Sequence, residues 1–235
     1  MADTLQIGLP LLSAAQAQKH VTVNEALTRL DGLVQLRLQS VTETIPPAVF
    51  ADGDSYAVPS GATGDWAGAV GRIAIASNGG WDFIDPQFGF RAVVVDQAAE
   101  AVFDGAAWRL GALSFTANRA GLSAASVELD VAITPGSSVV SPAILPERSI
   151  VFGVTGVVTA AITGATAWRI GVATDDQRYG TGLQTSAGAW LSGPSTPIVY
   201  WSPTSLLVTS EDTDFTGGSV RLAVHYMTLS IPDTA

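Results

Sequence analysis

The spacing of apolar residues changes from helical to alternating early in the chain. From Val23 the apolar side chains recur on one helical face, which predicts one or two short helices at the start of the sequence. The stripe has two interpretations. It packs on a sheet of its own domain, which is the favoured one, or it forms a seam between identical subunits. Its members are Val23, Ala26, Leu27, Leu30, Leu33 and Val34.

After Gly32 apolar and polar residues alternate, and this alternation is typical of strands. Short strands continue to about Leu113, with three segments in which a glycine turn precedes a tryptophan: Gly64–Trp66, Gly79–Trp81 and Asp104–Trp108. Exposed tryptophans of this kind could form sugar platforms. A small module with a thin core needs its tryptophans for packing, so we expect these three to cover the sheet.

Beyond Ser123 the alternation predicts about seven strands separated by turn residues, and no long helix. The apolar stretch 149–168 has the length of a membrane span, but its glycines and threonines predict a β-hairpin instead. This pattern is typical of an antiparallel β-sandwich of the jelly-roll kind. The expected strands are 127–134, 150–163, 167–174, 179–185, 198–201, 206–209 and 219–231.

These patterns together predict a mainly β protein with two domains. Residues 1–115 would form an N-terminal domain of short helices and tryptophan hairpins, and residues 116–235 an antiparallel, jelly-roll-like β-sandwich. The boundary falls in residues 116–123, a polar, glycine-containing stretch between strand-like runs.

Composition argues against nucleic-acid binding, a zinc site and secretion. The net charge is -10 and Lys19 is the only lysine, so a clustered basic face for nucleic acid is not expected. The absence of cysteine and the presence of only two histidines argue against a zinc site, and no cofactor is expected. The first residues lack the basic region and apolar core of a signal peptide, so we expect no export by the general secretion route and no membrane insertion.

Several segments resemble a phage-derived domain family of unknown function. The opening run from Leu9 to Leu27, Leu-Pro-Leu-Leu-Ser-Ala-Ala-Gln-Ala-Gln-Lys-His-Val-Thr-Val-Asn-Glu-Ala-Leu, is similar to the start of that family. Later blocks of the family are matched by Gly64-Asp-Trp-Ala-Gly68, Trp81-Asp-Phe-Ile-Asp-Pro86 and Phe103-Asp-Gly105 with Trp108. Longer members are matched by Arg178-Tyr-Gly-Thr-Gly-Leu183 and by the run Phe215–Tyr226.

The resemblance implies a place on a virus-like particle. Members of the family occur in tail-fibre-like prophage proteins and in gene transfer agents, where one forms the head spike fibre that is thought to engage the host's capsular polysaccharide. The implied function is a spike or fibre subunit on the particle surface, which binds host cell-surface polysaccharide and docks on a capsid or spike-base protein. The family has no established catalytic motif, so the resemblance assigns no catalytic residue.

Sugar recognition needs a flat aromatic face together with planar polar groups that bind hydroxyl pairs. The C-terminal half supplies both in segments that we expect to be loops. Trp190 stands between glycine-rich neighbours and is the aromatic residue most expected to be exposed, whereas Trp168 and Tyr200 alternate as core residues do. The candidate carbohydrate-binding residues are Asp175, Asp176, Arg178, Tyr179, Trp190 and Trp201.

Two alternatives remain open. The chain could be a spacer or collar subunit without a ligand, or a capsule depolymerase that uses two carboxylates of opposed pKa. Acid pairs occur at Asp175-Asp176 and at Glu211-Asp212 with Asp214, but in glycine- and serine-rich turns such acids are usually caps or solvated residues, and less often calcium ligands. We therefore expect no enzyme.

A single sugar site binds weakly, so firm attachment to a cell needs several linked sites. The binding function therefore predicts a homo-oligomer, a trimer or pentamer.

Overall fold

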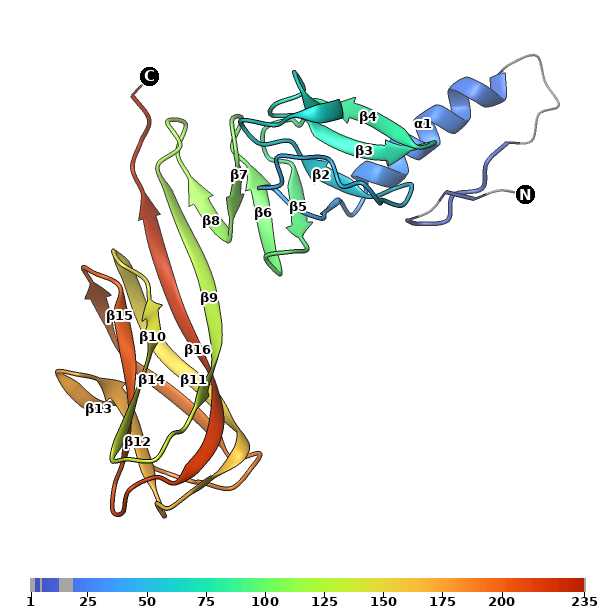
Figure 1. Cartoon of the computed structure of the whole chain (residues 1–235). Coiled ribbons are helices and arrows are strands. Elements are labelled where there is room, and N and C mark those ends of the chain that lie inside the picture. The colour runs from blue at the N-terminus through green and yellow to red at the C-terminus, as the bar shows by residue number, and fades with distance from the viewer. Residues whose placement is uncertain (1–2, 5, 13–18, 235) are drawn as a thin grey trace. The chain divides into compact units, whose positions relative to one another are not determined.

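The computed structural model describes residues 3–4, 6–12 and 19–234. It divides the chain into two compact units, Met1–Ala112 and Leu113–Ala235, each with its own core (Figure 1). Strands are the main regular elements of both units, which confirms the predicted fold class. Within the described residues, no helix combines the length and apolar character needed to cross a membrane.

The first unit is a seven-stranded mixed sheet with one α-helix, α1 (Lys19–Leu33). The order in the sheet is β4-β3-β2-β1-β5-β6-β7, and β1 pairs in parallel with both of its neighbours. The short 3-10 helix Gly64–Trp66 lies between β2 and β3 in sequence. The strands are β1 (Arg37–Leu38), β2 (Ser55–Ala57), β3 (Ile73–Ser77), β4 (Gly80–Ile84), β5 (Arg91–Val94), β6 (Ala99–Phe103) and β7 (Trp108–Leu110).

The tryptophans of the first unit pack inside it, as the sequence predicts. Trp66 is fully buried and contacts Trp81, with ring centroids 5.2 Å apart. Trp108 lies against Phe103 at a centroid distance of 5.4 Å. These residues therefore stabilise the small sheet and are not arranged as sugar platforms.

Helix α1 contacts its own unit through a different face from the one expected. Asp31 and Gly32 are buried, and a Cβ atom on Gly32 would lie 2.7 Å from the side chain of Ile75 on β3. The apolar stripe is left largely in solvent, with Val23 41%, Leu30 48% and Val34 38% exposed. The favoured interpretation, packing of the stripe on the unit's own sheet, is therefore wrong for most of its members, because the glycine side of the helix allows the closer approach.

The second unit is an antiparallel sandwich of two sheets around one core. One sheet has the order β10-β15-β12-β13 and the other β14-β11-β16-β9-β8. Successive strands from β9 to β16 alternate between the two sheets, except that β12 and β13 lie in the same one, and the first and last strands pair with each other. This is jelly-roll connectivity. The strands are β8 (Ala112–Phe115), β9 (Gly121–Ala132), β10 (Ser138–Leu145), β11 (Ser149–Thr163), β12 (Trp168–Val172), β13 (Asp175–Leu183), β14 (Trp190–Tyr200), β15 (Thr204–Ser210) and β16 (Gly217–Ser230).

The predicted strand 150–163 is present as β11, which pairs with β14 and β16. The predicted hairpin does not form, because the next strand, β12, lies in the opposite sheet. Gly153 and Gly156 lie inside β11 and do not mark a turn. A Cβ atom on Gly153 would lie 2.6 Å from the carbonyl oxygen of Gly193, and one on Gly156 would lie 2.8 Å from that of Arg221. Glycine is needed here because neighbouring strands approach closely, a role that the sequence pattern does not distinguish from a turn.

Residues 116–123, where the sequence places the domain boundary, form the turn between β8 and β9 and the first residues of β9. The amide of Thr116 donates to the carbonyl of Ala120, which closes this turn. Strand β8 is hydrogen-bonded to β9 and extends the sheet of the sandwich.

Candidate functional site: the outer face of the five-stranded sheet

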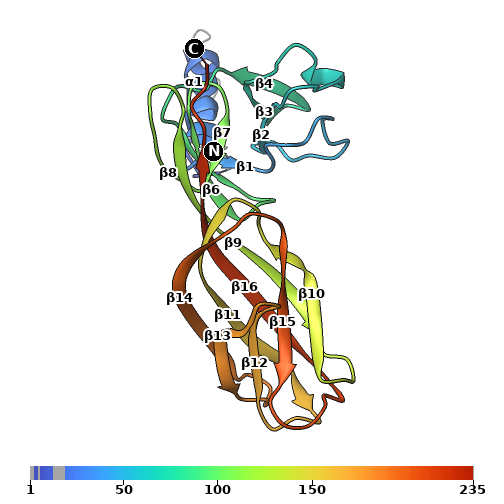
Figure 2. The same ribbon diagram turned by 90° about the vertical axis from the view of Figure 1, so that its left-hand side faces the viewer.

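The five-stranded sheet has a buried inner face and an exposed outer face. Leu222 and Val224 of β16 are fully buried in the core of the sandwich, as is Val154 of β11. Because side chains alternate along a strand, the residues between them point away from the core. Directly opposed residues of antiparallel strands share a face, so the outer face can be followed across the sheet row by row. Figure 2 shows β9 and β16 side by side along its length.

One row across the outer face begins at Trp190. Trp190 is paired with Val157, Val157 with Arg221, and Arg221 with Asp130. The row therefore crosses β14, β11, β16 and β9, a distance of about 14 Å at the usual strand spacing. Trp190 is 77% exposed and stands at the start of β14, the edge strand of this sheet.

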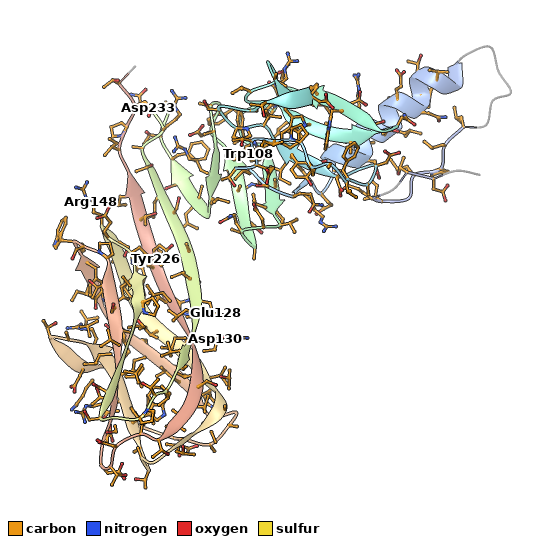
Figure 3. The ribbon with its side chains drawn as sticks, viewed as in Figure 1. Trp108, Glu128, Asp130, Arg148, Tyr226 and Asp233 are labelled. Carbon is orange, nitrogen blue, oxygen red and sulfur yellow. The ribbon has the colours of Figure 1, made fainter. Side chains whose placement is uncertain are left out.

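A charged group lies at the other end of this row. The guanidinium of Arg221 donates from Nε and Nη2 to the two carboxylate oxygens of Asp130, at 2.7 and 2.8 Å. Glu128 lies 3.6 Å from the same Nε, and both acids come from β9 (Figure 3). The Arg221 hydrogen bonds hold the pKa of Asp130 below its usual value. The group is thus a fixed planar ion pair with a second carboxylate beside it.

Hydroxyl groups and a histidine occupy the next rows. His225 is paired with Ser126 across β9, and its Nδ1 lies 2.8 Å from the Ser126 hydroxyl. Its Nε2 lies 2.8 Å from the hydroxyl of Thr155 on β11. The imidazole is held between these two hydroxyls. The face therefore combines an exposed indole, a planar ion pair and a hydrogen-bonded polar patch on a flat support.

Of the predicted residues, the structure places only Trp190 on this part of the face. Trp201 is equally exposed, at 79%, but it follows the opposite end of β14. An extended strand of this length separates the two indoles by about 30 Å. A single short ligand cannot contact both, so they do not form one site.

The four other predicted residues lie in the β12–β13 hairpin of the opposite sheet. Asp176 pairs with Arg169 at 2.8 Å, and Asp175 with Arg178 at 3.2 Å. Tyr179 is 1% exposed, so it cannot offer a ring face to a ligand at the surface.

The hydroxyl of Tyr179 lies 2.8 Å from that of Tyr200. Burial, together with this hydrogen bond, raises the pKa of Tyr179 above its usual range. The burial of Tyr200 and of Trp168 confirms their assignment to the core.

The remaining acid candidates organise turns. Glu211 accepts hydrogen bonds from the Thr181 hydroxyl at 2.6 Å and from the Gly182 amide at 2.8 Å. Asp212 accepts from the hydroxyl and the amide of Thr166. These hydrogen bonds lower the pKa of both carboxyl groups. Among the described residues, no group of three or more acids and histidines is arranged to hold a metal ion.

Sequence reasoning missed most of the face around Trp190. Arg221, His225, Asp130 and Glu128 lie inside strands β9 and β16, whereas the sequence pattern predicts the sugar-binding groups in loops. The signal was present, because polar residues alternate with valine and leucine in both β9 and β16. What the sequence could not supply is the register that brings these strands together.

Comparisons with known proteins give limited matches. Residues 23–109 match the model of a family described as a protein of unknown function, DUF2793. The search of curated proteins gave no match. Among solved structures, one matching chain belongs to the structure titled "Cyanophage Pam1 capsid asymmetric unit". It is 23% identical, covers 46% of this chain and 86% of that chain, and has a TM-score of 0.34, a value too low to establish a shared fold.

Proposed function

We propose that this chain is a structural subunit of a phage-like particle, such as the head spike of a gene transfer agent. Its second unit binds surface polysaccharide through the outer sheet face around Trp190. The observation that carries the binding role is the exposed indole in one row with the Arg221–Asp130 ion pair. A flat aromatic surface beside planar hydrogen-bonding groups is the arrangement that a sugar ring requires.

The place on a particle is supported by the sequence. Residues 23–109 match the DUF2793 model, and three of the segments on which the resemblance to phage-derived proteins rests lie in this range, with the end of the opening run. In this proposal the first unit docks on a capsid or spike-base protein, and the sandwich presents its outer face to the cell. The tryptophans of the first unit pack inside it, as expected for a structural module.

A binding role fits the carboxylates better than catalysis does. A glycosidase acid must keep its proton near neutral pH and therefore needs a raised pKa. Glu211 and Asp212 instead have lowered pKa values because hydroxyl and amide groups donate to them. Asp175 and Asp176 are each paired with a different arginine.

Attachment through weak sites calls for several copies, so we include a homo-oligomer in the proposal. The exposed stripe of α1 supplies a contact for an identical helix. Val23, Leu27, Leu30 and Val34 follow one another at spacings of four, three and four residues, the repeat by which helices pack side by side. The stripe carries no charge, so two copies of an acidic chain can approach there without direct repulsion.

The first experiment compares binding of the full-length protein to capsulated cells of its source and to cells without capsule. Trp190→Ala is the test variant, and Trp201→Ala, which removes an equally exposed indole, is its matched control. We expect capsule-dependent binding that Trp190→Ala weakens by about 2 kcal/mol per site, roughly thirtyfold, as loss of a central aromatic contact does. Trp201→Ala should bind as the wild type does.

Other outcomes decide among the alternatives. Equal binding to both cell types, or none, would leave a spacer or collar subunit. Release of new reducing ends from purified capsule would identify a depolymerase. Loss of binding in Trp201→Ala but not in Trp190→Ala would move the site to the other end of the sheet.

A further inference from the structure

We infer that the polysaccharide bound at the Trp190 face carries no acidic groups. This inference rests on the proposed function and specifies the ligand class of the same site. It follows from the excess of negative charge on the face and from the ion pair that already occupies its arginine.

Arg221, the arginine in the Trp190 row, is not available to an anionic sugar. Arg221 directs Nε and Nη2 at Asp130 in a two-pronged contact, and Glu128 is the next nearest carboxylate. One positive and two negative charges therefore lie at this end of the face. A uronate, sulfate or phosphate group would have to displace Asp130 and would still meet the charge of Glu128.

The other polar groups of the face are suited to hydroxyls. His225 has both ring nitrogens within 2.8 Å of hydroxyl groups, those of Ser126 and Thr155. Hydroxyls both donate and accept, so these groups can extend their network to the hydroxyls of an uncharged sugar. The exposed carboxylate oxygens of Asp130 and Glu128 accept from sugar hydroxyls in the same way.

The other arginines of the second unit do not offset the negative charge of Asp130 and Glu128 on this face. Arg169 and Arg178 are paired within the opposite sheet, and Arg119 is paired with Asp233. Arg148 is the exception, an exposed arginine for which the described residues of the unit supply no ion pair. It precedes Ser149, whose strand partner Tyr200 directly precedes Trp201.

The two exposed tryptophans thus have opposite surroundings. Trp190 shares its row with Arg221, which is already paired with acids, whereas Trp201 follows Tyr200, the strand partner of the residue next to Arg148. An acidic glycan would favour the Trp201 end, so Trp201→Ala and Arg148→Ala serve as controls.

The test uses capsular polysaccharide purified from the source cells, in its native form and after chemical reduction of its carboxylates to primary alcohols. Binding of the full-length protein is measured for both forms, at salt concentrations from about 0.05 to 0.5 M, over which charge attraction is strongly screened. The variant Asp130→Asn/Glu128→Gln, which removes two exposed negative charges, is measured beside the wild type.

We expect binding to survive carboxylate reduction, to change less than threefold with salt, and not to tighten in the double variant. Loss of binding on reduction, a tenfold fall with salt, or a tenfold gain in the double variant would overturn the inference while leaving polysaccharide attachment in place. Failure of the protein to bind either form would overturn both the inference and the proposed function.

Discussion

Asp104 shows how one side chain fixes a turn in the first unit. Its Oδ1 accepts hydrogen bonds from the amides of Ala106 and Ala107, and its Oδ2 accepts from Nε of Arg109. Gly105 adopts a positive φ of 93°, which a residue with a side chain rarely does. The segment Phe103-Asp-Gly105 with Trp108, singled out in the sequence, is therefore a structural turn that positions Trp108 against Phe103.

Replacement of Asp104 by Asn should destabilise the first unit in a pH-dependent way. Burial alone would raise the pKa of Asp104, but the Ala107, Arg109 and Ala106 hydrogen bonds outweigh it and leave the pKa below 3.8. Because the pKa is lower in the folded state, the carboxylate stabilises the fold fully above about pH 4, and this stabilisation is lost as the pH falls through the folded pKa. Urea unfolding at pH 7 should show a loss of about 1.5–3 kcal/mol in Asp104→Asn.

The difference between variant and wild type should shrink below pH 4, where the wild-type carboxyl group also becomes protonated. Asp85→Asn is the control, because its ion pair with Arg72 is exposed and should contribute less than about 1 kcal/mol. A loss in Asp104→Asn that stays constant down to pH 2 would contradict the role assigned to the carboxylate charge.

At the residue scale, the sequence allowed the exposure of Trp190 and the burial of Trp168 and Tyr200 to be predicted. Glycine neighbours marked the first, and strand alternation marked the other two. Tyr179 was harder to place, because Arg178 and two aspartates precede it and give the segment the composition of a surface loop. Its burial depends on Tyr200, a partner 21 residues away whose hydroxyl it contacts, and local sequence does not reveal such a pair.

At the element scale, the strands missed by the sequence lie at sheet edges. β10 contains Pro142 and has an irregular register beside it, and the first half of β14 contains Pro194. Proline is tolerated in edge strands and bulges because an edge residue need not donate to a neighbour. The central strands β11 and β16, in contrast, show the regular alternation by which most of their length was predicted.

We predict that identical chains associate through the exposed apolar stripe of helix α1. Leu30→Glu places a charge in the middle of the exposed stripe, where Leu30 is 48% exposed and contributes little to its own unit. Two or more such charges facing one another should separate the copies. Light scattering should then report a mass near 24.2 kDa for the variant and a multiple of it for the wild type.

Val49→Glu is the matched control, because Val49 is 90% exposed in the same unit and lies outside α1. It introduces the same charge and should leave the mass unchanged. If Leu30→Glu keeps the wild-type mass, the copies associate through another surface, or the chain acts as a monomer.

At the scale of the whole molecule, the number of copies and the strength of one site make separate contributions to attachment. A single site on an open sheet face has little enclosed surface, so its affinity for a short oligosaccharide should be weak, with a Kd near millimolar. Linked copies convert each further contact with a long polymer into an intramolecular step, which can raise the overall affinity by about 10²- to 10⁴-fold without any new contact.

Leu30→Glu and Trp190→Ala should therefore fail in different ways. In calorimetric titration with a short capsule oligosaccharide, Leu30→Glu should bind as the wild type does, because the Trp190 face lies in the other unit and is unchanged. On capsulated cells the same variant should lose about 100-fold or more, because its copies no longer act together. Trp190→Ala should lose affinity in both assays. An equal loss of oligosaccharide binding in Leu30→Glu would mean that assembly completes the site itself, and the sheet face of one chain would then be only part of it.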